Sequence, residues 1–229
     1  RLVEDIRTFR TSRSRYRQLG VPYHRGYLLY GPPGTGKTSL VSALAAHFGM
    51  SIYAVNLTEF NDKSLRTAMN DVPENSVVLL EDIDCMRTGN RRPQANEKKS
   101  VPDAAKAESG QLGVTLSGLL NVLDGFHAPE NVLFVMTTNR IEVLDPALLR
   151  PGRIDYKLFM GEATKSQKVE LYGRFFPSCS SAEALRFAEM HHAETMAQFQ
   201  GLLLALERRA EEFDGGSLAE EPVLEEIAS

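Results

Sequence analysis

The sequence predicts an α/β fold in which helices flank a parallel sheet, followed by a small α-helical domain. Two observations carry this prediction. Short apolar runs bounded by turn residues alternate with helical patterns through the first two thirds of the 229-residue chain, which is typical of parallel strands joined by helical crossovers. After Gly161 only helical patterns remain. We therefore expect a large domain over residues 1–160, a helical domain over residues 161–215 and an acidic, flexible tail over residues 216–229.

Four apolar runs are expected to form strands. Each lacks the polar alternation of a half-exposed strand, and they span residues 27–30, 52–55, 77–80 and 132–136. The arginine-rich start of the chain is expected to be helical up to the Gly-Val-Pro break at residues 20–22, and further helices are expected at residues 39–48, 64–69, 116–123, 166–175, 182–190 and 195–213. Residues 88–113 combine basic residues, glycines and prolines with few large apolar side chains, which predicts a long mobile loop.

Composition excludes several functional classes. A net charge of −4 provides no global basic field for nucleic acid, so no nucleic-acid partner is expected. No apolar run approaches the roughly 20 residues that cross a bilayer. Because the sequence begins at Arg1, we expect an absent upstream region, and a membrane would be contacted only through it. Cys85 and Cys179 are expected to be free thiols, and the histidines lack the spacing of a zinc site.

The segment from Gly31 to Thr38 fits the phosphate-loop pattern G-x-x-x-x-G-K-[ST] in full, between an expected strand and an expected helix. Its glycines let backbone N–H groups turn toward phosphate oxygens, and the following helix directs its positive end at the same anion. Lys37 would bring a full charge to the β- and γ-phosphates, and the Thr38 hydroxyl is a hard ligand for Mg²⁺. The expected nucleotide-binding residues are Gly31, Pro32, Pro33, Gly34, Thr35, Gly36, Lys37, Thr38 and Ser39.

Carboxylates stand at the end of one buried run, at Glu81, Asp82 and Asp84. A strand that ends beside a phosphate loop can aim one carboxylate at Mg²⁺ and the next at the attacking water. We assign Glu81 to the Mg²⁺ position, partly through water, and Asp82 to orienting or activating the attacking water. Aspartate is one methylene shorter than glutamate, so a shared or exchanged assignment stays open. Asp84 is expected to be a structural cap.

Two more polar segments follow the run at residues 132–136. Asn139 could hold the attacking water or contact the γ-phosphate, although an asparagine after a strand is more often a turn residue. Residues 145–153 begin with the Asp-Pro pair typical of a helix start and are stopped by Pro-Gly. They carry Arg150 and Arg153, and arginines held at a surface suit insertion into a neighbour's nucleotide site. A salt bridge within the chain is the alternative for each.

Together these motifs resemble the AAA ATPase family, through its phosphate loop at residues 31–38 and its second region of homology at residues 137–155. One subfamily is especially similar: it contains the mitochondrial inner-membrane chaperone that translocates the Rieske iron–sulfur protein during assembly of respiratory complex III. The similar segments are residues 20–30, 79–84, 115–125 and 197–201. Most AAA proteins have aspartate then glutamate where this chain has Glu81 then Asp82, and the resemblance marks this order as a subfamily trait.

The resemblance implies a P-loop AAA large domain with a parallel five-stranded sheet, a small α-helical lid and a homo-oligomeric ring that binds ATP and Mg²⁺. Asn139 would be the first sensor, and Arg150 and Arg153 the arginines acting in trans. A second-sensor arginine is not evident. The implied catalytic set is Lys37, Glu81, Asp82, Asn139, Arg150 and Arg153.

In function, the resemblance implies an ATP-hydrolysing chaperone that remodels or translocates a protein client. Residues 57–63 lack the aromatic–apolar–glycine loop that AAA unfoldases usually place at the pore, which favours movement of a folded client. A eukaryotic source would imply the mitochondrial inner membrane with this domain in the matrix, and a bacterial source the cytoplasm. The alternative is an assembly module that binds ATP as a structural ligand with negligible hydrolysis.

Overall fold

The computed structural model describes residues 1–85, 113–124, 129–193 and 195–214, with side chains up to residue 209. The loop expected at residues 88–113, apart from Gly113, and the tail expected at residues 216–229 lie outside this described part. The chain separates into two compact units, Arg1–Met160 and Gly161–Ser229. Each unit is described by itself.

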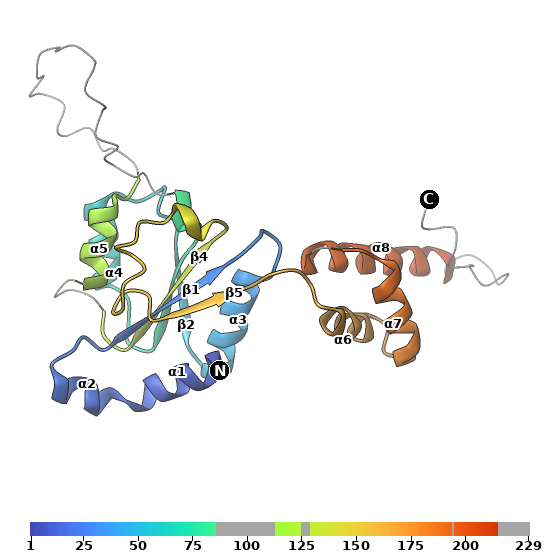
Figure 1. Ribbon diagram of the computed structural model, residues 1–229, viewed down its shortest axis with the longest axis horizontal. Helices are drawn as coiled ribbons and strands as arrows, with labels where there is room; N and C mark the ends of the chain where they lie inside the picture. Colours follow the sequence, from blue (N-terminus) through green and yellow to red (C-terminus); the bar gives the residue numbers. More distant parts are fainter. Residues whose placement is uncertain (86–112, 125–128, 194, 215–229) are drawn as a thin grey trace, which may run out of the picture. The chain divides into compact units, whose positions relative to one another are not determined.

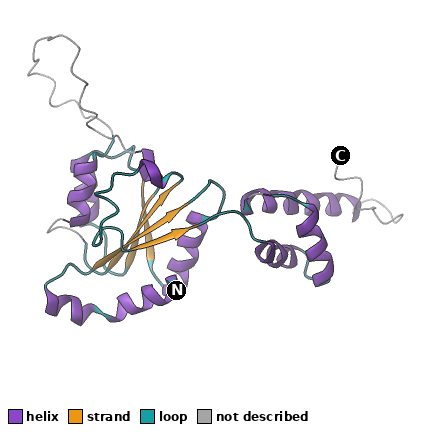
Figure 2. Ribbon diagram, viewed as in Figure 1, coloured by secondary structure: helices purple, strands orange, loops and turns teal. Residues whose placement is uncertain are grey.

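The first unit is built on a five-stranded parallel sheet with the strand order β2-β3-β4-β1-β5 (Figure 2). Its strands are β1 (His24–Tyr30), β2 (Ser51–Val55), β3 (Ser76–Leu80), β4 (Val132–Thr138) and β5 (Tyr156–Phe159). The first four overlap the expected runs, so the predicted parallel sheet is confirmed. Strand β5 lies outside those runs, because it is a four-residue edge strand whose side chains alternate between half-buried and exposed.

Helices cover both faces of this sheet (Figure 1). On one face lie α1 (Leu2–Thr11), α2 (Arg13–Leu19) and α3 (Lys37–Phe48), and on the other lie α4 (Asp62–Asn70) and α5 (Leu116–Asp124). Successive strand residues feed the two cores in turn: Tyr27 and Leu29 pack with α1 and α3, whereas Leu28 packs with α4 and α5. Burying each such side chain stabilises the fold by roughly 1.5–3 kcal/mol, which explains why β1, β3 and β4 are apolar on both faces.

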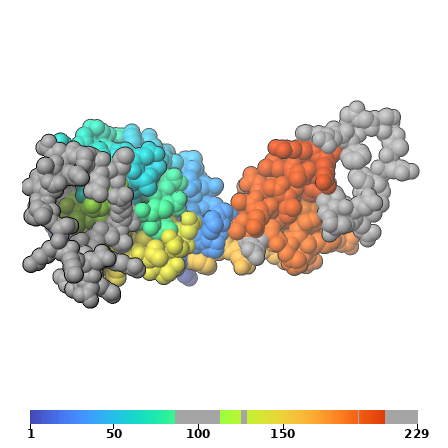
Figure 3. All heavy atoms as spheres, turned by 90° about the horizontal axis from the view of Figure 1, so that it is seen from above, coloured from blue at the N-terminus to red at the C-terminus, as the bar shows by residue number. Residues whose placement is uncertain are grey.

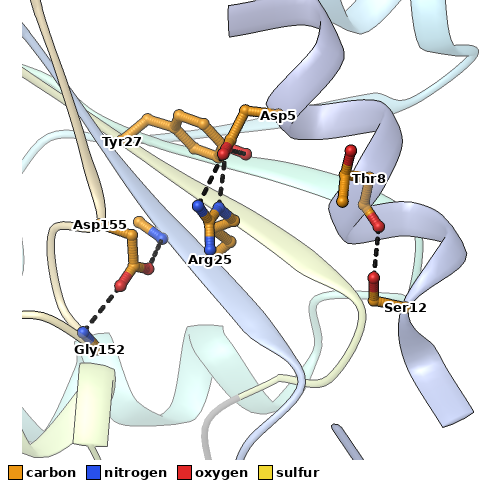
Figure 4. A network of polar contacts seen from close by, with 8 residues as sticks. Asp5, Thr8, Ser12, Arg25, Tyr27, Gly152 and Asp155 are labelled. Carbon is orange, nitrogen blue, oxygen red and sulfur yellow. Dashed lines mark hydrogen bonds and ion pairs between the residues drawn. The ribbon is translucent and has the colours of Figure 1, made fainter. Parts of the chain in front are cut away.

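A polar network pins α1 to β1 (Figure 4). The Arg25 guanidinium donates from Nε and Nη2 to the two carboxylate oxygens of Asp5, at 2.7 Å each, and the Tyr27 hydroxyl donates to Asp5 at 2.9 Å. The Arg25 and Asp5 side chains are about three-quarters buried. Burial, together with the hydrogen bond to Asp5, raises the pKa of Tyr27. The first helix is therefore fastened to the central strands by a charged pair as well as by apolar packing.

The second unit contains α6 (Lys165–Phe175), α7 (Ser181–Met190) and α8 (Met196–Asp214). Two of its helices begin with reciprocal capping boxes, Thr164 with Gln167 and Ser180 with Glu183, which satisfy otherwise unpaired backbone N–H groups. Its small core is formed by Phe187, Ala193, Phe199 and Leu203. None of the helices in the described part of the chain is long and apolar enough to cross a bilayer.

One prediction from the sequence is wrong: the helix expected to start at Asp145-Pro146 does not form. Residues 146–153 form consecutive turns and no helix. The Asp145 side chain accepts the N–H of Ala147 at 2.8 Å, and the N–H groups of Leu148 and Leu149 bond carbonyls only three residues back. With a proline five residues after Pro146, the segment is too short to propagate a helix.

Candidate nucleotide-binding site

The phosphate-loop segment joins β1 to α3. Gly34 and Gly36 adopt φ angles of 76° and 89°, a region that residues with a side chain rarely occupy. The loop is closed by its own residues, because the Thr35 hydroxyl donates to the Pro32 carbonyl at 2.9 Å. Gly36 stands at the N-cap of α3 and has no side chain with which to cap it. The first N–H groups of α3 therefore stay available to an anion.

Lys37 links this loop to the end of β4. Its side chain is buried, and Nζ donates to the carbonyls of Gly31 and Pro32 at 2.8 and 2.9 Å and to Oδ1 of Asn139 at 2.8 Å. Burial lowers the pKa of Lys37, and the negative charges of Asp82 and Asp84 act in the opposite direction. The ammonium group is thus held in one place by three acceptors.

The acidic end of β3 meets both the loop and β4. The Thr38 hydroxyl donates to Oε1 of Glu81 at 2.8 Å, and Nδ2 of Asn139 donates to Oδ1 of Asp82 at 3.3 Å. All four of these side chains belong to exposed residues. The structure therefore brings together five residues from three parts of the sequence: Lys37, Thr38, Glu81, Asp82 and Asn139.

The oxygen donors at this place suit Mg²⁺. Hydroxyl and carboxylate oxygens are the hard ligands that this ion prefers, and it commonly takes only one or two of them from the protein, with water and phosphate oxygens supplying the rest. The contact between Thr38 and Glu81 shows that both oxygens can face one point. Thr38 and Glu81 therefore fit the Mg²⁺ ion that we expected from the sequence.

Two threonines of β4 that sequence reasoning did not single out also reach the acidic segment. The Thr137 hydroxyl accepts the backbone N–H of Asp82 at 3.1 Å, and the Thr138 hydroxyl donates to Oδ1 of Asp84 at 2.8 Å. Asp84, with a side chain only 6% exposed, also accepts from Arg140. The signal was present in the sequence as two hydroxyls at the end of an apolar strand, but a threonine pair alone does not indicate which backbone it contacts.

The structure separates the two candidate trans arginines. Arg150 is exposed, and its side chain makes no hydrogen bond or ion pair with any residue that the structure describes. Arg153 is bound within the chain: Nη1 donates to the carbonyl of Ala147 at 2.6 Å, and the guanidinium forms an ion pair with Asp124. In the space-filling view, the yellow segment that follows β4 lies at the surface of the first unit (Figure 3).

The turn that carries these arginines is seated on β1 by Asp155 (Figure 4). One carboxylate oxygen of Asp155 accepts the N–H of Gly152 at 2.8 Å and the other accepts the N–H of Gly26 at 3.0 Å, while the Asp155 N–H donates to the Gly26 carbonyl at 2.8 Å. A Cβ atom at Gly26 would overlap the carbonyl of Arg153. Only glycine therefore permits this close approach of the two backbones.

Comparison with known proteins shows what the chain is similar to. The family model described as "ATPase family associated with various cellular activities (AAA)" matches residues 27–162, more than half of the chain. The chain is 42% identical over 209 residues to the "Probable mitochondrial chaperone BCS1-A" of Dictyostelium discoideum, covering 89% of this chain and 48% of that protein. It is 40% identical over 208 residues to the "Mitochondrial chaperone BCS1" of Danio rerio (88% and 48%), and 39% identical over 191 residues to that of Homo sapiens (82% and 44%).

The chain spans less than half the length of these relatives. The matched region nevertheless spans the phosphate loop, Glu81, Asp82, Asn139 and both arginines. The matched region also holds four complete strands of the sheet, together with most of β1. On these grounds the chain belongs to the AAA family of ATPases.

Proposed function

We propose that this AAA domain binds Mg-ATP and hydrolyses it within a homo-oligomeric ring that remodels or translocates a protein client. One observation carries the proposal most directly. Asn139 accepts from the Lys37 ammonium and donates to the Asp82 carboxylate, so one residue joins the phosphate loop to the acidic strand end. A charge for phosphate and a carboxylate for water are the two groups that phosphoryl transfer to water requires side by side.

Within the site, the roles follow from charge and reach. Residues 31–39 would hold the nucleotide, with Lys37 directed at the β- and γ-phosphates. Thr38 and Glu81 would hold Mg²⁺, which supplies positive charge to the phosphate oxygens when it is bound. Asp82 would accept the hydrogen bond that orients or activates the attacking water, and Asn139 would hold Asp82 and that water in register.

Arg150 is proposed as the arginine that acts in trans. An arginine finger has to reach a neighbour's nucleotide, which an exposed, unbound guanidinium can do and a tethered one cannot. Arg153 is engaged by Asp124 and Ala147, so we propose that it supports the turn from within its own subunit. We further propose that residues 161–215 form a helical domain that acts as the lid of the nucleotide site.

The chaperone assignment rests on the relatives. Proteins covering most of this chain at 39–42% identity carry the name mitochondrial chaperone, and on that basis we propose a protein client and a mitochondrial location with this domain in the matrix, or the cytoplasm for a bacterial protein. Any membrane contact would be made by a region outside this chain. The rival function is an assembly module with bound ATP and negligible hydrolysis, favoured by the Glu81–Asp82 order.

Steady-state ATPase activity, with particle mass recorded on the same sample, tests the proposal. The variants are Asp82→Asn and Arg150→Ala, with Arg66→Ala as a control that removes an exposed arginine from α4. We expect turnover that rises with protein concentration and falls at least about 100-fold in both variants, while binding of a fluorescent ATP analogue is retained. An oligomer that binds the analogue but turns ATP over no faster than Asp82→Asn would establish the rival function instead.

A further inference from the structure

Asp82 has a strained backbone. Its φ angle is +47°, in the left-handed region, where a side chain costs roughly 1 kcal/mol or more relative to glycine. Such a conformation persists only where surrounding contacts hold it. Because the backbone conformation sets the direction of the Cα–Cβ bond, it also sets where the Asp82 carboxylate points.

The contact that holds this backbone comes from β4. Strands β3 and β4 pair in parallel, and their last paired residues are Leu80 and Met136. Asp82 lies just beyond the end of that ladder, where no strand carbonyl receives its N–H. The hydroxyl of Thr137, on the residue after Met136, accepts it at 3.1 Å. A side chain therefore takes over the hydrogen bonding where the backbone pairing stops.

Thr137 is well placed to hold its position. It is only 3% exposed, and it is paired with Leu29 of β1 in the centre of the sheet. On its C-terminal side, Asp82 is held by a second bond, because the Asp82 carbonyl accepts the N–H of Cys85 at 2.8 Å. The peptide groups that flank this residue are thus bonded to a rigid strand on one side and to a short helical turn on the other.

We propose that Thr137 is a positioning residue for ATP hydrolysis, and that it acts by fixing the backbone of Asp82 so that its carboxylate meets the attacking water. This inference rests on the role proposed above for Asp82. Thr137 has no contact with Lys37 or Thr38 among its described interactions, so it should leave nucleotide and Mg²⁺ binding alone. Its effect should fall on the rate of turnover.

The test compares isosteric changes in the assembled protein. Thr137→Val removes the acceptor and keeps the shape, whereas Thr137→Ser keeps the hydroxyl. Ser76→Ala is a matched control, because the Ser76 hydroxyl is buried on the neighbouring strand and has no hydrogen-bond partner in the described part of the chain. We expect Thr137→Val to lower kcat by about 10- to 100-fold, since a displacement near 1 Å has effects of this size. Thr137→Ser and Ser76→Ala should stay within about threefold of the parent.

Two further measurements separate positioning from a structural role. KM for ATP and the affinity for a fluorescent ATP analogue should change by less than about threefold in Thr137→Val. In the Asp82→Asn background, Thr137→Val should add less than about a twofold effect, because residues that act as a unit are not additive. If Thr137→Val does not assemble, Thr137→Ala against Thr137→Ser makes the same comparison.

The outcomes distinguish the two levels of the proposal. Loss of turnover in Asp82→Asn with full turnover in Thr137→Val would overturn the role of Thr137 and leave the proposed function standing. Equal turnover in the parent and in Asp82→Asn would overturn both. A Thr137→Val effect that multiplies fully with Asp82→Asn, or that appears mainly in KM, would show that Thr137 acts elsewhere.

Discussion

The Arg153 guanidinium donates hydrogen bonds to the carboxylate of Asp124, with Nε lying 3.0 and 2.9 Å from its two oxygens. Asp124 is the last residue of α5, so this ion pair fastens the turn after β4 to a helix on the sheet. The hydrogen bond to Asp124 raises the pKa of Arg153. Arg150, three residues earlier, is exposed, so we expect the two arginines to have different physical tasks.

The first prediction separates these tasks. Arg153→Ala should lower the free energy of unfolding by about 1–2 kcal/mol, because a charged hydrogen-bonded pair and a carbonyl contact are lost at a partly exposed site. Asp124→Asn should lose a similar amount, and the two changes together should cost less than their sum. Arg150→Ala should leave stability within about 0.5 kcal/mol of the parent. Urea denaturation measures all four proteins, and a loss in Arg150→Ala equal to that in Arg153→Ala would contradict the assignment.

The second prediction concerns Asp155, whose carboxylate binds the backbone N–H groups of Gly26 in β1 and of Gly152 in the turn that carries Arg150 and Arg153, called the arginine turn below. Asp155→Ala should lower turnover while retaining nucleotide binding, because the turn that presents Arg150 loses its anchor. Its cost in stability should be about 1–2 kcal/mol, below the usual value for two charge-assisted bonds because the site is exposed.

Assemblies mixed from two variants show whether Asp155→Ala impairs hydrolysis in its own subunit or in the neighbouring one. Asp155→Ala subunits keep an intact nucleotide site, and Asp82→Asn subunits keep an intact arginine turn. Mixing the two should restore part of the turnover, whereas mixing Asp155→Ala with Arg150→Ala should restore none. Recovery in both mixtures, or in neither, would show that Asp155 does not act through the trans arginine.

The third prediction tests the anchor of α1. Asp5→Asn should lower the free energy of unfolding by about 1–3 kcal/mol, because it weakens a largely buried bidentate pair and one tyrosine hydrogen bond. Glu4→Gln is the matched control on the same helix, since the Glu4–Arg7 pair is exposed at both ends and should contribute less than about 0.5 kcal/mol. Thermal or urea unfolding decides between them, and equal losses would mean that burial does not strengthen the Asp5 pair.

The fourth prediction is a pH dependence. Burial lowers the pKa of His24 below 6.5, against the opposing charges of Asp155 and Asp124. As the pH falls below about 6.5, the His24 imidazole therefore takes up a proton in the unfolded chain before it does so in the folded chain. The stability that comes from burying the neutral ring is present above that pH and is lost as the pH falls toward the pKa of the folded state. His24→Phe, which keeps an aromatic ring against Phe134, should lose less stability than the parent between about pH 7.5 and pH 5.5. His47→Gln, at an exposed position, is the control for replacing a histidine.

Local patterns predicted much of the fold because their physical causes are local. Apolar runs without polar alternation predict four of the five strands. Three of them, β1, β3 and β4, are buried on both faces, whereas most residues of the edge strand β2 are exposed. Strand β5 was not predicted because it is an edge strand that pairs with β1 alone, and such a strand does not need an apolar run. The helix-start signal at Asp145-Pro146 predicts a helix where turns form at residues 146–153, because such a signal does not reveal that the following hydrogen bonds close after three residues.

Residue types and their spacing are enough to identify the phosphate-loop pattern, the acidic strand end and each candidate side chain. The contacts among these side chains emerge only in the folded structure: Asn139 joins Lys37 to Asp82, Arg153 is bound to Asp124, and the Thr137 hydroxyl accepts the N–H of Asp82. These contacts cross between strands, helices and turns that lie far apart in the chain. Their partners are set by strand order and register, which no local pattern encodes.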